Sequence, residues 1–224
     1  MSPRVRARAS SVGTKIVIGA SGLFLVAYLA IHIIGNVLVF FGPRVFNTYA
    51  YSMEGRNPTL PLLEIAILAG FAAHIYKTVG MFLANHAARP VAYRMKKRAG
   101  APSRKSFASS TMIFSGLWVL VFLVIHVKAF RFSPEIARPE GGRDLYRQEM
   151  DVFVNPFMVA FYVISMLFVG SHLWHGVSSA VLSLGADQSR WTPRVRVAGR
   201  IFAVLVAGAF IVIALWAHFI GARP

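Results

Sequence analysis

Residues Thr14–Asn36 read TKIVIGASGLFLVAYLAIHIIGN, and this stretch decides the fold of the chain. Lys15, near its start, is the one residue in it with a full charge. A helix needs about 20 predominantly apolar residues to cross the hydrocarbon core of a bilayer, so the stretch predicts a transmembrane helix. His32 lies inside it. An ionisable side chain within a membrane span marks a candidate functional site, because its burial in hydrocarbon costs free energy.

Four more apolar stretches follow along the chain of 224 residues, which is 56% hydrophobic with a mean hydropathy of +0.59. The surface of a soluble domain is more polar than that composition allows. No strand-like alternation competes with helices, so the predicted fold class is all-α, an integral membrane bundle. The first apolar run is too long for a signal peptide, so we expect no cleaved leader. We expect a single domain, residues 1–224, with five transmembrane helices at residues 14–41, 60–85, 108–131, 153–183 and 196–220.

The chain carries 24 Lys and Arg against 8 Asp and Glu, a formal net charge of +16. If the helices alternate in direction, 15 of the basic residues fall on one side of the membrane and six of the acids on the other. The positive-inside rule then places the N-terminus in the cytoplasm and the C-terminus outside. Topology accounts for most of the basic excess, so nucleic acid is not an expected partner. Docking of a partner protein or of anionic lipid headgroups is a second interpretation.

The histidines pair by depth in this topology. His32 lies about nine residues before the outer end of the first predicted helix, and His126 about five residues before the outer end of the third. His74 and His172 each lie about eleven residues before the inner ends of the second and fourth helices. One pair therefore lies in the outer half of the membrane and the other in the inner half. At about 1.5 Å of rise per residue, the two levels are roughly 9–20 Å apart.

Histidine pairs facing each other inside a helical bundle are typical ligands of haem iron, so the two levels predict two b haems. The absence of cysteine excludes covalent haem attachment through cysteine and iron–sulfur ligation by this chain. The alternative for any single histidine is a hydrogen bond to a neighbouring helix. From spacing alone, His175 competes with His172 as the inner ligand, since residues three apart share a helix face.

The residues quoted above also resemble a known family. The resemblance lies in Thr14–Asn36, in FNTYA (Phe46–Ala50), in DLYRQEMDVFVNPF (Asp144–Phe157) and in GSHLWHGVSSAVLSLG (Gly170–Gly185). These segments are similar to the five-helix, di-haem cytochrome b membrane anchors of succinate dehydrogenase and fumarate reductase. The resemblance covers nearly the whole chain in the same helix order, and it implies that the single domain is a transmembrane cytochrome b domain.

The resemblance implies an electron-transfer subunit of a succinate:quinone oxidoreductase in the cell inner membrane. It implies two haem b groups, a flavoprotein subunit and an iron–sulfur subunit as partners, and membrane quinone, either menaquinone or ubiquinone, as substrate. His32 and His126 would hold the outer haem. His74 and His172 would hold the inner one, because the family ligand lies thirteen positions before the glycine matching Gly185. His175 would then support the ligand or contact a haem propionate.

The quinone site is predicted on the outer side. Glu64 is the one acid inside an apolar run, PLLEIAI, and a carboxylate beside the quinone ring can exchange the protons that quinone chemistry needs. Tyr49, Asn36 and Arg44 are its expected neighbours. Two alternatives remain open at this point: Glu64 is an interfacial carboxylate that reaches water, or the site is an inner one using Ser21, Ser178 or Ser179.

Two other functions compete with this interpretation. One is the cytochrome b subunit of a nitrate reductase, formate dehydrogenase or hydrogenase. Those families hold their haems with fewer helices, whereas one histidine on each of the first four helices favours the succinate type. The other is a haem-free membrane transporter or assembly protein, and we find no broken helix pair or inverted repeat that indicates a transporter.

Overall fold

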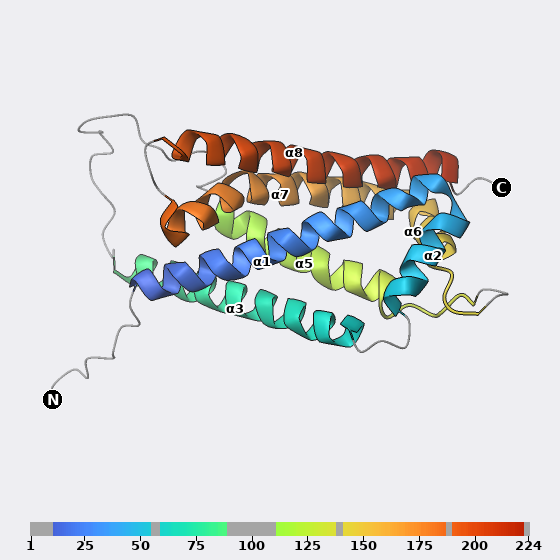
Figure 1. Cartoon of the computed structure of the whole chain (residues 1–224), viewed down its shortest axis with the longest axis horizontal. Coiled ribbons are helices and arrows are strands. Elements are labelled where there is room, and N and C mark those ends of the chain that lie inside the picture. The colour runs from blue at the N-terminus through green and yellow to red at the C-terminus, as the bar shows by residue number, and fades with distance from the viewer. Residues whose placement is uncertain (1–10, 55–58, 89–110, 138–140, 187–189, 222–224) are drawn as a thin grey trace.

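The computed structural model describes residues 11–54, 59–88, 111–137, 141–186 and 190–221 of the chain (Figure 1). These residues form helices and connecting turns, and their one β-bridge is isolated, between Ala137 and Arg143. The elements in chain order are α1 (Ser11–Val37), η1 (Leu38–Phe41), α2 (Pro43–Glu54), α3 (Thr59–Ala87), α5 (Met112–Phe130), α6 (Leu145–Val154), α7 (Pro156–Val181), η2 (Leu182–Ala186), α8 (Thr192–Trp216) and η3 (Ala217–Gly221).

Five of the described helical segments are long and apolar enough to cross a membrane, which confirms the predicted all-α bundle of five transmembrane helices. Their bounds lie within a few residues of the predicted ones, although residues 108–110 and most of the connection at 86–107 fall outside the described residues. The segments are Val12–Phe41, Leu60–Ala87, Met112–Phe130, Pro156–Ala186 and Thr192–Gly221. The chain is therefore a multi-pass membrane protein.

The fourth span begins later than the predicted residue 153 because a capping residue interrupts the helix there. Asn155 has an extended backbone, and its side-chain Oδ1 accepts a hydrogen bond from the backbone N–H of Phe157 at 2.9 Å. Pro156 follows at the first helical position, where its missing N–H is not needed. The residues before Asn155 form the separate amphipathic helix α6, and the first connection, predicted as turns, contains the helix α2.

The spans pack around two central helices. α7 and α8 form the most extensive helix pair, α1 packs against α3, α7 and α8, and α5 packs against α7 (Figure 1). The core between α7 and α8 contains Met166, Leu173, Ala203 and Val206. α3 lies at the edge of the bundle, and none of its apolar span is buried inside the protein. Its outward-facing apolar side chains are those that a bilayer would cover.

A cap of polar contacts joins α2 and α6 at the end of the bundle where α8 finishes (Figure 1). The side chain of Asn47 on α2 donates to Asp144 Oδ1 at 2.8 Å and accepts from the backbone N–H of Tyr146 at 3.0 Å. Gln148 on α6 donates to the carbonyls of Ala129 and Phe130, which are exposed by the end of α5. By our predicted topology this is the outer end of the bundle. At the opposite end, Gly185 terminates the fourth span with φ of +100°, a value that favours glycine.

Candidate functional site

The structure brings together the two histidines predicted for the outer level. The ring of His32 on α1 lies 5.9 Å from the ring of His126 on α5, measured between ring centres, with the two planes at 86°. Tyr28, one turn before His32, stacks on the His32 ring at 5.4 Å. Phe122 and Phe130 lie on either side of His126 along α5, with ring centres 5.4 and 5.2 Å from it. Aromatic side chains therefore surround the outer pair.

The two histidines predicted for the inner level also face each other. The ring of His74 on α3 lies 6.5 Å from the ring of His172 on α7, with the planes at 71°. Two glycines allow this approach. A Cβ on Gly22 would lie 3.3 Å from the His74 ring, and a Cβ on Gly116 would lie 3.4 Å from the His172 ring. The inner pair thus comes from α3 and α7, and each of its rings lies against a glycine, on α1 for His74 and on α5 for His172.

The spacing of both pairs fits one metal ion held between two imidazoles. A metal–imidazole nitrogen bond is about 2 Å long, and the nitrogen lies about 1 Å from the ring centre, so two such rings on opposite sides of a metal have centres roughly 6 Å apart. The measured separations of 5.9 and 6.5 Å agree with this value. Haem iron takes two axial ligands from the protein, and each level supplies two.

The hydrogen bonds of the inner pair determine which ring nitrogen carries the proton. Ser115 Oγ donates to the Met112 carbonyl at 3.0 Å, so toward His172 Nδ1, 3.2 Å away, it acts as the acceptor. His74 Nδ1 lies 3.3 Å from the carbonyl of Ile18, which can only accept. Both Nδ1 atoms therefore carry hydrogen. The lone pair of each ring is then on Nε2, the nitrogen left for a metal.

The outer pair shows related contacts. His126 Nδ1 lies 3.1 Å from the hydroxyl oxygen of Tyr162 on α7. Asn36 donates to the carbonyl of His32 at 2.7 Å, and its amide nitrogen, which can only donate, lies 3.4 Å from His32 Nδ1, so this contact places no hydrogen on that ring nitrogen. Ligand histidines usually have their second nitrogen held by a polar partner, which orients the ring. That arrangement holds for both inner histidines and for His126.

The helices that carry each pair are not in close contact with each other. α1 and α5 are absent from the closely packed helix pairs of the described bundle, and so are α3 and α7. The histidine side chains reach across these separations, and all four rings are half-buried rather than sealed in the core. A flat group the size of a porphyrin needs separated helices of this kind, so the residues fit the predicted haem pockets.

His175 occupies a different environment from His172. No other histidine ring lies against it in the described residues, and Arg196 on α8 lies within electrostatic reach of it. Ser178 donates to the backbone carbonyl of His175 at 3.2 Å. Between the two candidates on α7, it is His172 that the structure places opposite His74.

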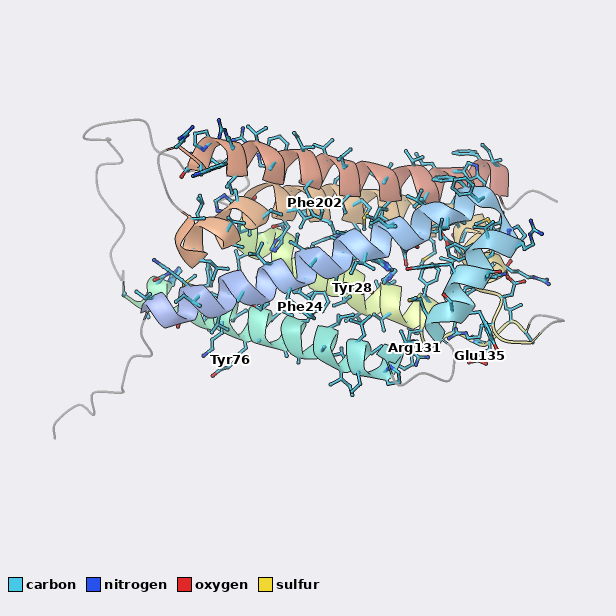
Figure 2. The ribbon with its side chains drawn as sticks, in the orientation of Figure 1. Phe24, Tyr28, Tyr76, Arg131, Glu135 and Phe202 are labelled. Atoms are coloured by element: carbon cyan, nitrogen blue, oxygen red, sulfur yellow. The ribbon has the colours of Figure 1, made fainter. Side chains whose placement is uncertain are left out.

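Glu64, the predicted quinone-site acid, forms an ion pair that the sequence did not indicate. Its Oε1 accepts from Arg131 Nε at 2.8 Å and its Oε2 from Arg131 Nη2 at 3.4 Å. Arg131 follows the last residue of α5 and lies beside the start of α3 (Figure 2). The two side chains are 36% and 53% exposed, so the pair remains accessible. Tyr28 lies within electrostatic reach of both Glu64 and Tyr49, which connects the ion pair to the outer histidines.

The structure brings two of the three expected neighbours into this region. Tyr49 packs against Gly35, where a Cβ would be 2.6 Å from its ring. Asn36, the next residue, bonds to His32 as described above. Arg44 does not contact Tyr49 or Asn36. Its side chain is exposed, and its backbone carbonyl accepts a hydrogen bond from the Thr48 hydroxyl.

The serines of the alternative inner quinone site have other partners. Ser21 Oγ donates to the Val17 carbonyl at 2.7 Å and lies 3.3 Å from His74 Nδ1. Ser178 is buried and bonds to the α7 backbone, and Ser179 is half-buried. Ser21 therefore belongs to the surroundings of the inner histidine pair.

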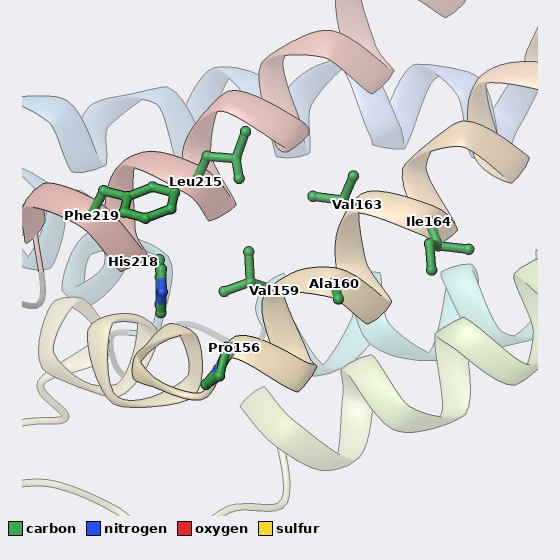
Figure 3. Close-up of a pocket in the computed structure, with 8 residues that line it drawn as sticks. All are labelled: Pro156, Val159, Ala160, Val163, Ile164, Leu215, His218 and Phe219. Carbon is green, nitrogen blue, oxygen red and sulfur yellow. The ribbon is translucent and has the colours of Figure 1, made fainter.

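A pocket of about 360 Å³ lies away from both histidine pairs, between α7 and the end of α8 (Figure 3). Its lining is apolar except for His218, whose Nδ1 bonds to the Phe153 carbonyl at 2.7 Å. His218 is thus held by the backbone at the end of the bundle that carries α2 and α6, and Figure 3 shows its ring beside Phe219 and Val159. The pocket contains no polar group arranged to orient a ligand, so we assign no site to it.

Sequence reasoning missed four residues next to the candidate site: Tyr28, Ser115, Arg131 and Tyr162. Tyr28 precedes His32 by four residues, a spacing that places both on one helix face and that could have indicated the contact. The other three contact histidines or an acid on different helices. Those contacts depend on how each helix is rotated, which the sequence alone does not fix.

Comparison with known proteins adds no relative: no family model, no curated protein and no solved structure matches the chain. Among the described residues, no group of three or more His, Cys, Asp or Glu side chains gathers to hold a metal ion. The histidines come in facing pairs. A pair is the number of protein ligands that a haem uses, since the porphyrin supplies the other four nitrogens.

Proposed function

We propose that this chain is a di-haem cytochrome b that carries electrons through the membrane. The observation that supports it most is the pair of facing histidines at each of two levels, with ring centres 5.9 and 6.5 Å apart. His32 and His126 would hold one haem b, and His74 and His172 the other. A bound haem supplies one-electron chemistry at its iron, and the two histidines tune its potential through their hydrogen bonds.

We further propose that the chain is the membrane anchor of a succinate:quinone oxidoreductase in the inner membrane, with its N-terminus in the cytoplasm. Support comes from the family resemblance and from the placement of the four histidines on four separate helices, which the competing cytochromes do not share. An iron–sulfur subunit would exchange electrons with this chain, and a flavoprotein subunit would carry out the dicarboxylate chemistry. His175 and the basic residues around it would lie on the side of these partners.

The quinone site that we propose lies at the outer end, around Glu64, Arg131, Tyr28 and Tyr49. In this arrangement Arg131 orients the Glu64 carboxylate through the 2.8 Å contact, and Tyr28 lies between this ion pair and the His32 ring. Glu64 would accept or donate the quinone proton. Arg131 would hold a quinone oxygen by a charge-assisted hydrogen bond.

The experiment that tests this function is purification of the tagged chain from its native membranes, followed by reduction with different donors. We expect a flavoprotein and an iron–sulfur protein to copurify, and succinate to reduce the b-type absorption bands. Reduction by formate or hydrogen but not by succinate would assign the chain to one of the competing oxidoreductases. Absence of any b-type band would refute the cytochrome assignment itself.

A further inference from the structure

Glu149 on α6 is a buried carboxylic acid that the proposed function does not yet use. Its residue is 4% exposed, and its carboxyl forms no hydrogen bond with any other residue that the structure describes. Burial raises the pKa of Glu149 to about 8. Keeping an unpaired acid in such a position costs free energy, and groups of this kind concentrate where protons are exchanged.

A side chain near Glu149 also contacts the outer histidine pair. Tyr162 on α7 lies within electrostatic reach of Glu149, and its hydroxyl oxygen is 3.1 Å from His126 Nδ1. Tyr146, on α6 itself, is also within reach of Glu149. Phe153, one turn after Glu149 on α6, packs against Tyr162 with ring centres 5.0 Å apart, so α6 brings the acid close to the side chain that contacts a proposed ligand of the outer haem.

No cation holds Glu149 in its ionised form. Burial is the one cause of its raised pKa, with no contribution from a neighbouring charge. Arg143, just before α6, donates instead to Phe130 and Gln148. His218 on η3 is bonded to the Phe153 carbonyl. Among the side chains that the structure describes, the remaining charged or titratable groups on α6 and on the elements packed against it are Arg147 and Asp151 on α6, Arg44, Tyr49 and Tyr51 on α2, Lys128 and His126 on α5, and His172 and His175 on α7.

We propose that Glu149 takes up the proton that accompanies one-electron reduction at the His32–His126 site. This inference rests on the proposed function. The electron comes from quinol or from the iron–sulfur subunit, the proton comes from water at the outer end, and the product is the neutral Glu149 carboxylic acid. The added negative charge and the added proton balance, so the net charge of this buried region does not change.

The direction of the effect follows from the charges. With two neutral imidazoles, an oxidised haem core carries one more positive charge than a reduced one, and that charge stabilises the Glu149 carboxylate. The pKa of Glu149 is therefore lower in the oxidised state than in the reduced state. At a pH between these two pKa values, reduction of the outer site is accompanied by uptake of a proton. Each rise of one pH unit in this range then lowers the potential of the outer site by up to about 59 mV.

The first test is a redox titration of the purified full chain by visible spectroscopy, repeated from about pH 6 to about pH 9. We expect the potential of the outer component to fall with pH in the wild type and to lose that dependence in Glu149→Gln. Glu149→Asp, which keeps an acid, should retain it. Asp151→Asn, an exposed acid on the same helix, should behave as wild type. An outer component with the wild-type pH dependence in Glu149→Gln would overturn the inference.

The second test does not depend on haem. Infrared spectra of the same proteins, recorded after reduction, should show a protonated carboxyl band at neutral pH that Glu149→Gln removes and that Asp151→Asn leaves. Absence of this band in the reduced wild type would overturn the inference. If the band is present but the chain binds no haem, the proposed function fails and the coupling fails with it. If both haems bind and the pH dependence is unchanged in Glu149→Gln, the inference alone fails.

Discussion

The hydroxyl oxygen of Tyr162 lies 3.1 Å from Nδ1 of His126, so a side chain on α7 orients a histidine on α5. When Nε2 of a histidine binds a metal, Nδ1 carries the hydrogen and donates to its partner. Such donation makes the imidazole a stronger electron donor and favours the oxidised metal. Tyr162 is thus placed to lower the potential of the outer site without touching the iron.

Removing this hydroxyl should raise the outer potential while both haems stay bound. We expect Tyr162→Phe to shift the outer component upward by tens of millivolts, where about 59 mV corresponds to a tenfold change in the relative stability of the two oxidation states. The inner component should not move. Tyr76→Phe is the matched control, since Tyr76 is 74% exposed on α3 (Figure 2). An unchanged outer potential in Tyr162→Phe would show that the contact does not tune the site.

Replacing single histidines should separate the two levels. His32→Ala and His126→Ala should each abolish the same redox component, and His74→Ala and His172→Ala should each abolish the other. The reason is that each pair shares one metal position, with ring centres 5.9 or 6.5 Å apart. His175→Ala is the control and should retain both components. Loss of the same component from His32→Ala and His74→Ala would contradict the pairing, as would loss of the inner component from His175→Ala alone.

The Glu64 carboxylate should matter for quinone chemistry and not for haem binding. Glu64→Gln keeps the size of the side chain but removes proton exchange and the charge that pairs with Arg131. We expect quinone-linked turnover at saturating quinone to fall about 100-fold, a common contribution of a general acid or base. Glu135→Gln is the control, because Glu135 is a 70% exposed acid whose nearest cation is 3.8 Å away. Wild-type turnover in Glu64→Gln would leave Glu64 as an interfacial carboxylate.

Glu149 should also affect the stability of the folded protein in a pH-dependent way. Its pKa is raised from 4.5 to about 8, so between these values the folded chain holds a proton that the unfolded chain has released. Stability therefore falls as pH rises from about 4.5 to about 8 and then levels off. Glu149→Gln should lack this fall, so its melting temperature should exceed that of the wild type by a margin that widens with pH. Thermal unfolding followed by circular dichroism measures it, and a constant margin would contradict the raised pKa.

The sequence was sufficient to predict the five spans, because length and hydropathy define a membrane helix. The alternating direction of the helices then predicted which histidines would face each other. Depth alone brought His32 beside His126 in the prediction, and the structure places them together. The side-chain contacts between helices could not be predicted from the sequence. Ser115 faces His172, and Arg131 faces Glu64 across 67 positions, only because of the way the helices are rotated and packed.

The glycines illustrate the same limit. Gly35 and Gly70 lie near His32 and His74 along their own helices, but the structure places Tyr49 against Gly35 and Phe24 against Gly70. Gly22 and Gly116 on other helices are the ones that lie against histidine rings. Proximity along one helix does not identify the neighbours of a glycine, because each glycine faces whichever helix packs against it. The separate helix α6 was missed for a different reason: Arg147, Glu149 and Asp151 made most of its residues resemble a polar connection between spans.

The central claim is that each chain binds two haems, one per histidine pair, and the most direct measurement is the ratio of haem b to protein in the purified chain. Haem would be extracted and quantified against amino-acid analysis, for the wild type and for His32→Ala and His74→Ala. The account predicts two haems per wild-type chain and one in each variant. A wild-type ratio of zero or one would contradict it.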